Sequence, residues 1–471
     1  MTATPSRTLP LLAFSALALG ACAAPSLDRA EALPPAPTVF AAAEDAAPPA
    51  GDWLAAFDDP VLPLLTAEAL THNADFRAAA ARLDQARASA RVAGAPRLPS
   101  LDASGSVTER DSSAFPSSTT SYALGLNASW EADVWGRVAA TAGAAAYDAE
   151  ASEADYQGAR LSLAGATAQA WFALIEAELQ EALAARDVGN RERSLDFIER
   201  RYRSGVNTSL DVRLARSALA TSRATLQLRR QTLGEAQRTL EVLLGRYPAA
   251  ELAGAADLPD LAPLAGAGAP ADLLWRRPDM IAADLRLESA GLRAEAARDA
   301  LLPRLTLQAG ANATSANTAN LLDADSIITS LVAGLAQPVF RGGALRGEAD
   351  RAEAAARERL ASYASSALTA WREAENALAA EDRLAERAGQ LRVAYEEAAR
   401  AEELAERQYR NGLVTIFNLL DAQARRITSE SQYIGARRER AANRVRLYLA
   451  IGGEFAAPTD FADLSAQEPA L

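Results

Sequence analysis

Cysteine and histidine, the side chains that most often carry nucleophilic, acid-base or metal chemistry, are almost absent from this sequence. Its 471 residues include one cysteine, Cys22, and one histidine, His72. A single cysteine excludes disulfide bonds within the chain and cysteine-rich metal sites. His72 lies in an amphipathic helical segment, where a surface position is the simplest interpretation, and there is no glycine-rich phosphate-binding loop. Without a catalytic constellation, the sequence predicts neither an enzyme nor a bound cofactor or metal.

The segment before Cys22 has the layout of a secretory signal. Arg7 supplies an early positive charge, and an apolar run extends from Leu9 to Leu19. Residues 1–21 are therefore expected to be removed from the mature chain. The four residues at the end of this segment resemble the bacterial lipobox: Leu19, Gly20, Ala21 and Cys22.

The lipobox resemblance implies that Cys22 becomes the first residue of the mature chain and carries several acyl chains, palmitate among them. Several chains are enough for stable anchoring in lipid, and Ala23 in place of an aspartate favours the outer membrane. The alternative is a chance cysteine beside an apolar leader. Residues 22–52 are rich in alanine and proline. They are expected to form an extended tether that packs no core, with the folded part beginning near Trp53.

The overall composition is that of a large folded protein. Hydrophobic residues make up 49% of the chain and charged residues 23%, a balance that differs from that of disordered chains. No segment after the leader approaches the roughly 18 to 20 continuous apolar residues of a membrane-spanning helix. The formal net charge of −13 argues against a nucleic-acid partner, because nucleic acids are bound by positive surfaces.

Two copies of one unit follow each other along the chain. Asp75, within Asn-Ala-Asp-Phe, matches Asp279, within Arg-Pro-Asp-Met, with an offset of 204 residues (279 − 75 = 204). Gly205 and Gly412, in matching Tyr-Arg-x-Gly sequences, have an offset of 207 residues (412 − 205 = 207). A loop of unequal length between the two matches explains the difference. The sequence therefore predicts repeat 1 at 53–250, a linker at 251–270, repeat 2 at 271–453 and a C-terminal tail at 454–471.

A long helix is predicted in each repeat, over residues 137–203 and 344–410. Both windows lack proline and are rich in alanine, leucine, glutamate and arginine, which favour helix. At about 1.5 Å per residue, each helix would be about 100 Å long. Helices of that length must pack laterally to be stable. Helical patterning resumes over 210–244 and 417–449, so each repeat is expected to form a helical hairpin.

The turns of these hairpins are predicted at Gly205 and Gly412, because glycine tolerates the left-handed conformation that ends many helices. The hairpin tips comprise residues 203–210 and 410–417. One stripe before the first turn has the spacing of a packed helix face: Leu195, Ile198 and Tyr202.

Four segments alternate apolar or small residues with polar ones, which is the pattern of strands with one apolar face. They lie at about 100–109 and 121–131 in repeat 1, and at about 304–313 and 327–337 in repeat 2. Polar loops are expected to join the strands of each pair: Glu109–Thr120 and Asn312–Ser326.

Strands of about ten residues have the length found in outer-membrane proteins. A small sheet packed on helices in water would give the same pattern. Strands in a lipid bilayer must form a closed barrel, and four strands are too few to close one. The chain must therefore oligomerise if these strands span a membrane.

Together these features resemble the outer membrane factor family, the TolC, OprM-like and NodT-like efflux proteins. The resemblance rests on the lipobox, the Asp58-Asp59-Pro60 sequence after Trp53, the two repeats and their Tyr-Arg-x-Gly turns. It covers the chain from 53 to 453. It implies a mainly α-helical fold with a transmembrane β-barrel portion. The expected assembly is a homotrimer, in which a twelve-stranded β-barrel in the outer membrane is continued by a long periplasmic α-helical barrel of coiled-coil hairpins.

The resemblance also implies a function and partners. The chain would be the lipid-anchored outer-membrane exit duct of a tripartite efflux system. It would passively conduct small molecules delivered by an inner-membrane pump, of the resistance-nodulation-division type, through a periplasmic adaptor protein. The alternatives are the outer-membrane component of a type I protein-secretion system and a non-conducting periplasmic coiled-coil scaffold. The sequence does not specify the substrate.

Residues of a periplasmic gate are carried over from the family by their distance from the two turn glycines. The lock would pair Tyr409 with Asp211, and a luminal acidic ring would be formed by Asp421, whose companion one turn earlier is Asn418. Three Asp421 carboxylates in a narrow lumen would attract cations and repel anions. The simpler interpretations are a solvated surface position for Asp421, ordinary coiled-coil packing for Tyr409 and a helix N-cap for Asp211.

The arginine that reinforces the lock in some family members is replaced here by Val414. The hairpin tips are expected to contact the adaptor, because both repeats present the same loop at the far end of a hairpin. The residues assigned to this contact are Arg203, Gly205, Val206, Arg410, Gly412 and Leu413.

Overall fold

The computed structural model describes residues 28–43, 53–112, 115–264 and 266–453, without the side chains of residues 112–118. The signal, the lipobox with Cys22 and the C-terminal tail lie outside these residues. The chain divides into two compact units. The described parts of the first are 28–32, 91–112, 115–145 and 287–361, and those of the second are 33–43, 53–90, 146–264, 266–286 and 362–453.

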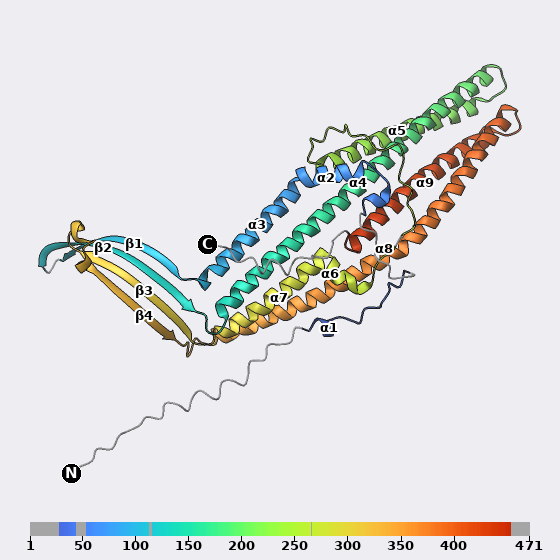
Figure 1. Cartoon of the computed structure of the whole chain (residues 1–471). Coiled ribbons are helices and arrows are strands. Elements are labelled where there is room, and N and C mark those ends of the chain that lie inside the picture. Colours follow the sequence, from blue (N-terminus) through green and yellow to red (C-terminus); the bar gives the residue numbers. More distant parts are fainter. Residues whose placement is uncertain (1–27, 44–52, 113–114, 265, 454–471) are drawn as a thin grey trace, which may run out of the picture. The chain divides into compact units, whose positions relative to one another are not determined.

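The first unit contains a four-stranded antiparallel sheet in the order β1-β2-β3-β4 (Figure 1). Strand β1 covers Ser100–Ser112, β2 Phe115–Ala132, β3 Arg304–Ser315 and β4 Ile327–Ala336. Each repeat contributes one pair of strands, and β2 pairs with β3 to join both repeats in one sheet. All four predicted strands are present, and β1 and β4 form the two edges of the sheet.

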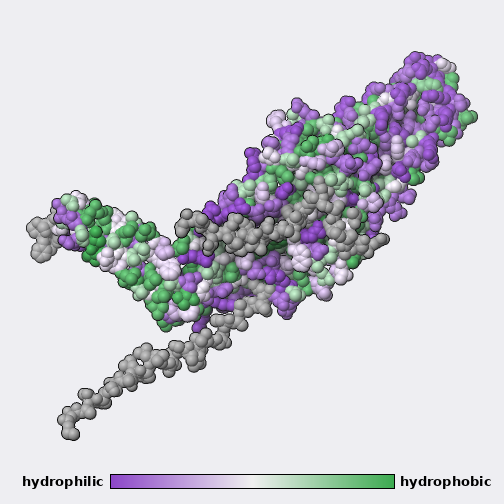
Figure 2. Space-filling view, in the orientation of Figure 1, coloured by the Kyte–Doolittle hydropathy of each residue, from purple (hydrophilic) through white to green (hydrophobic). Residues whose placement is uncertain are grey.

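One face of this sheet is apolar and exposed. The register aligns apolar residues across the strand pairs, for example Leu101 with Ala128 and Leu305 with Leu335. Leu101 is 66% exposed and Leu335 is 73% exposed, and Figure 2 shows apolar residues in green over the strands. An apolar surface of this kind is typical of a membrane or protein contact.

The predicted loop over Glu109–Thr120 is wrong for most of its length. Strand β1 continues to Ser112 and β2 begins at Phe115, so Arg110 still pairs with Thr119. The ladder hydrogen bonds come from backbone groups, so a polar sequence can continue a strand where it covers no core. The second loop is also shorter than predicted, because β3 extends to Ser315 and is followed by two 3-10 turns, η4 (Thr318–Asn320) and η5 (Ala324–Ser326).

The helices of the hairpins begin and end close to the predicted residues. Helices α4 (Arg137–Arg203) and α8 (Ala344–Arg410) have the predicted bounds, and the return helices α5 (Ser209–Leu243) and α9 (Ile416–Ala450) lie within one residue of theirs. We call α4 with α5 hairpin 1, and α8 with α9 hairpin 2. The shorter helical elements are α1 (Arg29–Ala32), η1 (Ala55–Phe57), α2 (Leu62–His72), α3 (Ala74–Gly94), η2 (Ala95–Arg97), η3 (Pro270–Asp272), α6 (Leu273–Arg276) and α7 (Pro278–Asp299).

Both hairpin turns have the same backbone geometry. Gly205 and Gly412 each have a φ of 74°. The Gly205 N–H donates to the carbonyl oxygen of Tyr202, and the next N–H, of Val206, donates to the carbonyl oxygen of Arg201, both at 2.9 Å. This pair of bonds is the Schellman motif, in which a left-handed glycine ends a helix. The predicted turn positions are confirmed.

Each return helix ends against the start of the helix that leads to the strands. Asn73, just before α3, donates from Nδ2 to the carbonyl oxygen of Leu243 at 3.0 Å. Arg277, just before α7, donates from Nη1 to the carbonyl oxygen of Ala450 at 3.1 Å. These residues occupy equivalent places in the two repeats, so the two hairpins are attached in the same way.

A glycine follows each return helix at this junction. Gly245 has a φ of 72° and Gly452 a φ of 92°. A Cβ on Gly245 would lie 2.6 Å from the carbonyl oxygen of His72, and one on Gly452 would lie 3.1 Å from that of Arg276. Both positions combine a left-handed backbone with close approach to another backbone segment, which only glycine tolerates without strain.

The tether prediction is wrong around Phe40. Phe40 is 2% exposed and belongs to the largest hydrophobic core of the second unit. The N–H of Ala41 donates to the carboxylate of Glu375 at 2.8 Å. Phe40, with Ala42 and Ala43 beside it, docks a segment whose average composition predicts no apolar face. The buried aromatic residues that Phe40 joins in this core are Trp53, Phe57, Trp171, Phe172 and Tyr448.

Part of the predicted linker is held by charged side chains of the hairpins. Glu241 of α5 is 2% exposed and accepts hydrogen bonds from the N–H groups of residues 250, 251 and 252 at 2.8, 2.7 and 3.3 Å. Glu178 of α4 accepts from the Gly254 N–H at 2.7 Å. Arg444 of α9 donates to the carbonyl oxygen of Ala262 at 3.0 Å. The segment is therefore bound to both hairpins through its backbone.

Within the residues that the structure describes, no helix is both long enough and apolar enough to cross a lipid bilayer.

Candidate functional site at the hairpin ends

The ends of hairpins 1 and 2 meet in a small hydrophobic cluster. Its buried members come from all four helices, with Ile198 of α4 fully buried and Tyr409 of α8 6% exposed. Tyr202, the repeat equivalent of Tyr409, is 47% exposed, so the predicted packed stripe holds for Leu195 and Ile198 and is wrong for Tyr202. The remaining buried members are Val212, Ala215, Ile416 and Leu419.

Tyr409 is the polar anchor of this cluster. Its hydroxyl accepts a hydrogen bond from Nδ2 of Asn207 at 2.7 Å, and its ring lies edge-on to Phe197 with a centroid distance of 6.1 Å. Burial raises the pKa of Tyr409; the hydrogen bond from Asn207 opposes this rise and the Asp211 carboxylate adds to it. The phenol is therefore neutral near pH 7 and can both donate and accept hydrogen bonds.

Arg201 of α4 brings the polar groups of the two ends together. Its Nε donates to Oδ1 of Asn207 at 3.0 Å, and its Nη1 donates to the carbonyl oxygen of Arg410 in hairpin 2 at 3.2 Å. Its guanidinium carbon lies 5.5 Å from the ring centroid of Phe197 and 5.9 Å from that of Tyr409. These distances are within the range of cation-π contacts.

Asp211 lies near Tyr409, but its hydrogen bonds serve its own helix. Its carboxylate accepts from the Thr208 N–H at 2.8 Å, and its N–H donates to Thr208 Oγ1 at 3.3 Å. This is a capping box in which Thr208 is the N-cap and Asp211 the third helical residue. Asp211 therefore takes part in capping the helix, but the N-cap residue itself is Thr208, three residues before the predicted position. In this chain the hydroxyl of Tyr409 binds Asn207 rather than Asp211.

Asn418 and Asp421 are exposed on α9, just after the turn of hairpin 2. Asn418 is the repeat equivalent of Asp211, and its Oδ1 accepts a hydrogen bond from Thr415 Oγ1 at 2.7 Å. The side chain of Asp421 is 62% exposed and lies 2.7 Å from Nε of Arg425. Arg425, four residues on, therefore compensates the charge of the predicted acidic ring position, and the i, i+4 spacing could have revealed it.

The turns themselves present apolar side chains at equivalent positions. Val206 and Leu413, in the two turns, are 62% and 73% exposed, and Leu210 and Phe417 one turn further on are 56% and 57% exposed. The predicted tip residue Arg410 pairs with Glu406, and Arg203 lies 3.7 Å from Glu199. Both hairpins therefore end in an exposed apolar patch with arginines beside it.

An ion network connects the hairpins farther from the turns. Arg186 of α4 lies 2.5 Å from Glu430 of α9, and Arg426 of α9 pairs with Glu430 and, at 2.6 Å, with Glu402 of α8. Burial raises the pKa of Glu402 and outweighs the opposing effect of Arg426. The Arg186–Glu430 pair joins hairpin 1 to hairpin 2, while Arg426 pairs with Glu402 and Glu430 within hairpin 2.

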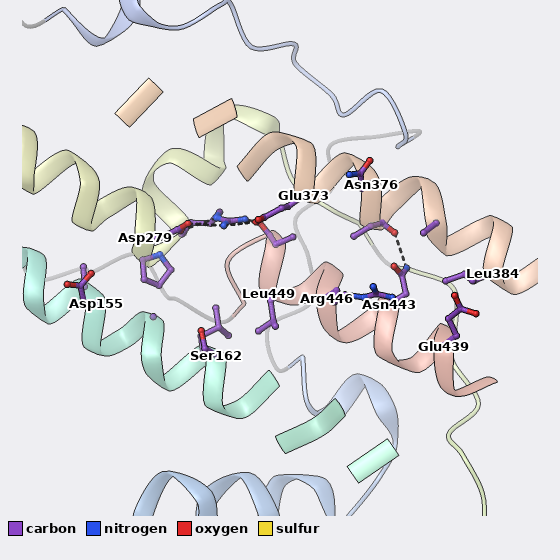
Figure 3. A pocket seen from close by; sticks show the side chains of 18 residues that line it. Asp155, Ser162, Asp279, Glu373, Asn376, Leu384, Glu439, Asn443, Arg446 and Leu449 are labelled. Carbon is purple, nitrogen blue, oxygen red and sulfur yellow. Dashed lines mark hydrogen bonds and ion pairs between the residues drawn. The ribbon is translucent and has the colours of Figure 1, made fainter. Parts of the chain in front are cut away.

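A cavity of about 840 Å³ lies between α4, α7, α8 and α9 in the second unit (Figure 3). Asp279 and Glu373 face each other across Arg277, which binds them at 2.8 and 2.9 Å. Glu439, also in this lining, pairs with Arg387 at 2.6 Å. Because these carboxylates are paired with arginines, they do not form a free acid-base pair. The cavity lies where helix α7 is attached to the hairpins.

The described part of the chain contains no recognisable set of metal ligands. No group of three or more histidine, cysteine, aspartate or glutamate side chains there is arranged to hold a metal ion. His72 is exposed, as predicted, and its Nδ1 lies 3.2 Å from the carbonyl oxygen of Glu68.

Known proteins resemble this chain along most of its length. It matches the family described as "Outer membrane efflux protein" over residues 65–246 and 269–453. It is 35% identical over 461 residues to the pyoverdine export outer membrane protein OpmQ of Pseudomonas putida, covering 95% of this chain and 97% of that protein. It is 32% identical to the outer membrane protein OprJ of Pseudomonas aeruginosa, covering 93% and 94%.

Solved structures agree with this assignment. The structure of the outer-membrane channel OprN superposes with a TM-score of 0.82 at 28% identity, covering 89% of this chain and 97% of that one. The mainly helical fold with antiparallel strands, predicted from the sequence, is confirmed. The chain belongs to the outer membrane efflux protein family.

Proposed function

We propose that this chain is the exit duct of a tripartite efflux system, a channel that passively conducts small molecules across the outer membrane and is gated at the hairpin ends. The observation that carries the proposal is the sheet. Its apolar face is exposed and its edge strands β1 and β4 are open. Both features require a further contact, because exposed edges and large apolar faces invite pairing and burial.

A homotrimer would satisfy both requirements. Three copies would supply twelve strands, with β1 of one copy paired to β4 of the next, and twelve strands are enough for a closed membrane barrel. The apolar face, including Leu101 and Leu335, would then point to lipid and the polar face to the lumen. The hairpins would continue the barrel into the periplasm as an α-helical tube.

Lipid anchoring at Cys22 would fix the N-terminus at the same membrane. The barrel alone would hold the protein there, since a closed sheet of this kind is stable in lipid. We therefore regard the anchor as accessory, and Cys22→Ala is expected to leave the trimer intact.

The partners would be a periplasmic adaptor and an inner-membrane pump of the resistance-nodulation-division type. The adaptor contact would be at the hairpin tips, where Val206, Leu210, Leu413 and Phe417 form exposed apolar patches of equivalent composition. Related proteins carry names that refer to pyoverdine, toluene and cations, which indicates that one duct architecture serves different substrates. We propose that the pump, rather than this chain, selects the substrate.

The gate would be closed by the contacts between hairpins 1 and 2. The cluster around Tyr409 holds the ends together, and Asp211 supports it by capping α5 next to Asn207. Asp421 would face the lumen near the gate. Because it is paired with Arg425, it would favour the passage of cations less than an unpaired carboxylate would.

The assembly can be tested by native mass spectrometry of the full chain released from detergent. A trimer is expected. In cells that lack their own exit duct, the chain together with a matching pump and adaptor should lower the accumulation of a fluorescent pump substrate. A monomer that is soluble once the lipid is removed, and that leaves accumulation unchanged, would contradict the proposal and favour a coiled-coil scaffold.

A further inference from the structure

Arg201 differs from the arginines around it in what it binds. Arg200 pairs with Asp196 of its own helix, and Arg203 lies 3.7 Å from Glu199. Among the described residues, Arg201 has no carboxylate within ion-pair distance; it contacts an amide oxygen, a backbone carbonyl and two aromatic rings. Its charge is therefore directed to neutral groups, which are held by hydrogen bonding and cation-π attraction.

Two of these partners belong to hairpin 2. Nη1 of Arg201 reaches the carbonyl oxygen of Arg410, which lies in the last turn of α8, where backbone carbonyls lack helical partners. The guanidinium also lies against the Tyr409 ring. A cation near the carboxyl end of a helix is further favoured by the helix dipole. Arg201 thus contacts both a backbone carbonyl and a side chain at the end of α8.

Asn207, a partner of Arg201 in hairpin 1, extends the same contact. Oδ1 of Asn207 accepts from Arg201, which leaves Nδ2 free to donate to the Tyr409 hydroxyl. The amide orientation is fixed by this arrangement, because Arg201 can only donate. Loss of the arginine would release Asn207 as well, so the hydrogen bonds from Arg201 to Arg410 and from Asn207 to Tyr409, which join the two turns, both depend on one side chain.

The repeat offers an internal comparison. The equivalents of Arg201 and Asn207 in hairpin 2 are Gln408 and Val414, which cannot form this arrangement. The equivalent of Tyr409 is Tyr202, which is exposed. The network therefore exists once in each chain, on the side where hairpin 1 meets hairpin 2.

We propose that Arg201 is the positioning residue of the gate: it holds Asn207 and Tyr409 in contact, and the hairpin ends separate only when its bonds to hairpin 2 are lost. This inference rests on the proposed gating function.

The test compares Arg201→Ala with Arg200→Ala in planar lipid bilayers, using the purified full-length trimer. Arg201→Ala should raise the fraction of time in the open state by about 5- to 30-fold, the change that a loss of one or two such interactions brings to a two-state equilibrium. Arg200 is exposed and, among the described residues, pairs only with Asp196 of its own helix, so Arg200→Ala should change this fraction less than about twofold. Arg201→Lys keeps the charge without the planar fork and should fall between them. Equal opening by Arg201→Ala and Arg200→Ala would overturn the inference.

A double-mutant comparison separates positioning from a general loss of packing. Tyr409→Phe removes the hydroxyl but keeps the ring. If Arg201 acts through Asn207, adding Tyr409→Phe to Arg201→Ala should cause little further opening, because the same hydrogen bond is already released. Fully additive effects would contradict a shared network. Trimer content and circular dichroism of each variant identify any that fail to fold, and Arg201→Gln serves as the replacement.

A crosslinking experiment distinguishes failure of this inference from failure of the gate itself. Asn207→Cys with Tyr409→Cys, joined by a short bismaleimide, places a covalent tie where the hydrogen bond was. Lower conductance after crosslinking shows that the ends form the gate, whatever Arg201 does. If crosslinking forms in high yield and conductance stays the same, the ends do not control the pore, and the gating proposal and this inference both fail.

Discussion

Gly245 and Gly452 allow a sharp test of how the two hairpins are attached. They occupy equivalent positions after the return helices, and their φ angles of 72° and 92° are in the left-handed region. An alanine at 245 would place its Cβ 2.6 Å from the carbonyl oxygen of His72, a backbone atom that cannot rotate away. We predict that Gly245→Ala is among the most destabilising single-methyl substitutions in the chain.

The magnitude has two parts. A left-handed backbone costs a residue other than glycine about 1–2 kcal/mol. Forcing a methyl group into an occupied space adds about 1–3 kcal/mol, which gives about 2–5 kcal/mol for Gly245→Ala. At Gly452 the nearest atoms are 3.1 Å away, so the total should be smaller. Gly205 and Gly412 have a φ of 74°, and a Cβ added to either would meet no neighbouring atom within 4 Å, so alanine there should cost only the first part.

Thermal unfolding of the purified protein, followed by circular dichroism in one detergent and at one scan rate, checks this ranking. The unfolding temperature should fall most for Gly245→Ala, less for Gly452→Ala and least for Gly205→Ala and Gly412→Ala. If Gly245→Ala lowers it no more than Gly205→Ala does, the close packing of this turn on His72 is not a source of stability.

Three further predictions follow from the charged groups. Desolvation opposes the ionisation of Glu241, but three backbone N–H groups bind its carboxylate and hold its pKa below the usual value. The stability that the ionised carboxylate contributes is present above about pH 4.5 and is lost as the pH falls through the lowered pKa. Glu241→Gln should therefore cost about 1–3 kcal/mol at pH 7 and less near pH 3, measured by denaturant unfolding. Burial raises the pKa of Glu402, so the stability linked to its protonation is fully present below about pH 4.5 and is lost as the pH rises through the raised pKa. Glu402→Gln should remove this loss of stability at higher pH. An unchanged pH profile of the unfolding temperature would contradict the prediction. Arg425→Ala should leave Asp421 unpaired and raise the cation preference of the pore, measured as a shift in reversal potential in a salt gradient, while an unchanged potential would place Asp421 away from the ion path.

The hairpins could be predicted closely because their signals are local and repeated. Proline is absent from both long windows, and glycine marks both turns, so the bounds of α4 and α8 follow from the sequence. The strands were identified by alternation, but their ends were not. Beyond Glu109 the sequence becomes polar while the backbone ladder continues to Ser112, and side-chain patterns do not report ladder bonds.

Tertiary contacts decided what the pattern could not. Tyr202 and Tyr409 have the same place in their repeats and the same helical spacing, yet only Tyr409 is buried. The cluster between the hairpin ends accommodates one of the two rings, and helical periodicity treats both alike. Phe40 shows the same limit, since it is a single aromatic side chain within a proline-rich stretch and its burial in the aromatic core leaves no periodic pattern in the sequence.

The contacts at the hairpin ends differ from those expected from the sequence. The predicted pair of Tyr409 with Asp211 is not a hydrogen bond; the hydrogen bonds run through Asn207 and Arg201. A signal for these two residues was available: within matching turn segments, Arg201 and Asn207 stand where the second repeat has Gln408 and Val414. Differences between the two copies therefore point to residues with a role beyond folding.

The central claim is that this chain forms a gated pore, and conductance across a planar lipid bilayer tests it most directly. The purified full-length trimer should produce discrete current steps of uniform size that are mostly closed, and Arg201→Ala should lengthen the open periods. A folded trimer that inserts into the bilayer and leaves it as insulating as lipid alone, for both the natural chain and Arg201→Ala, would contradict the claim.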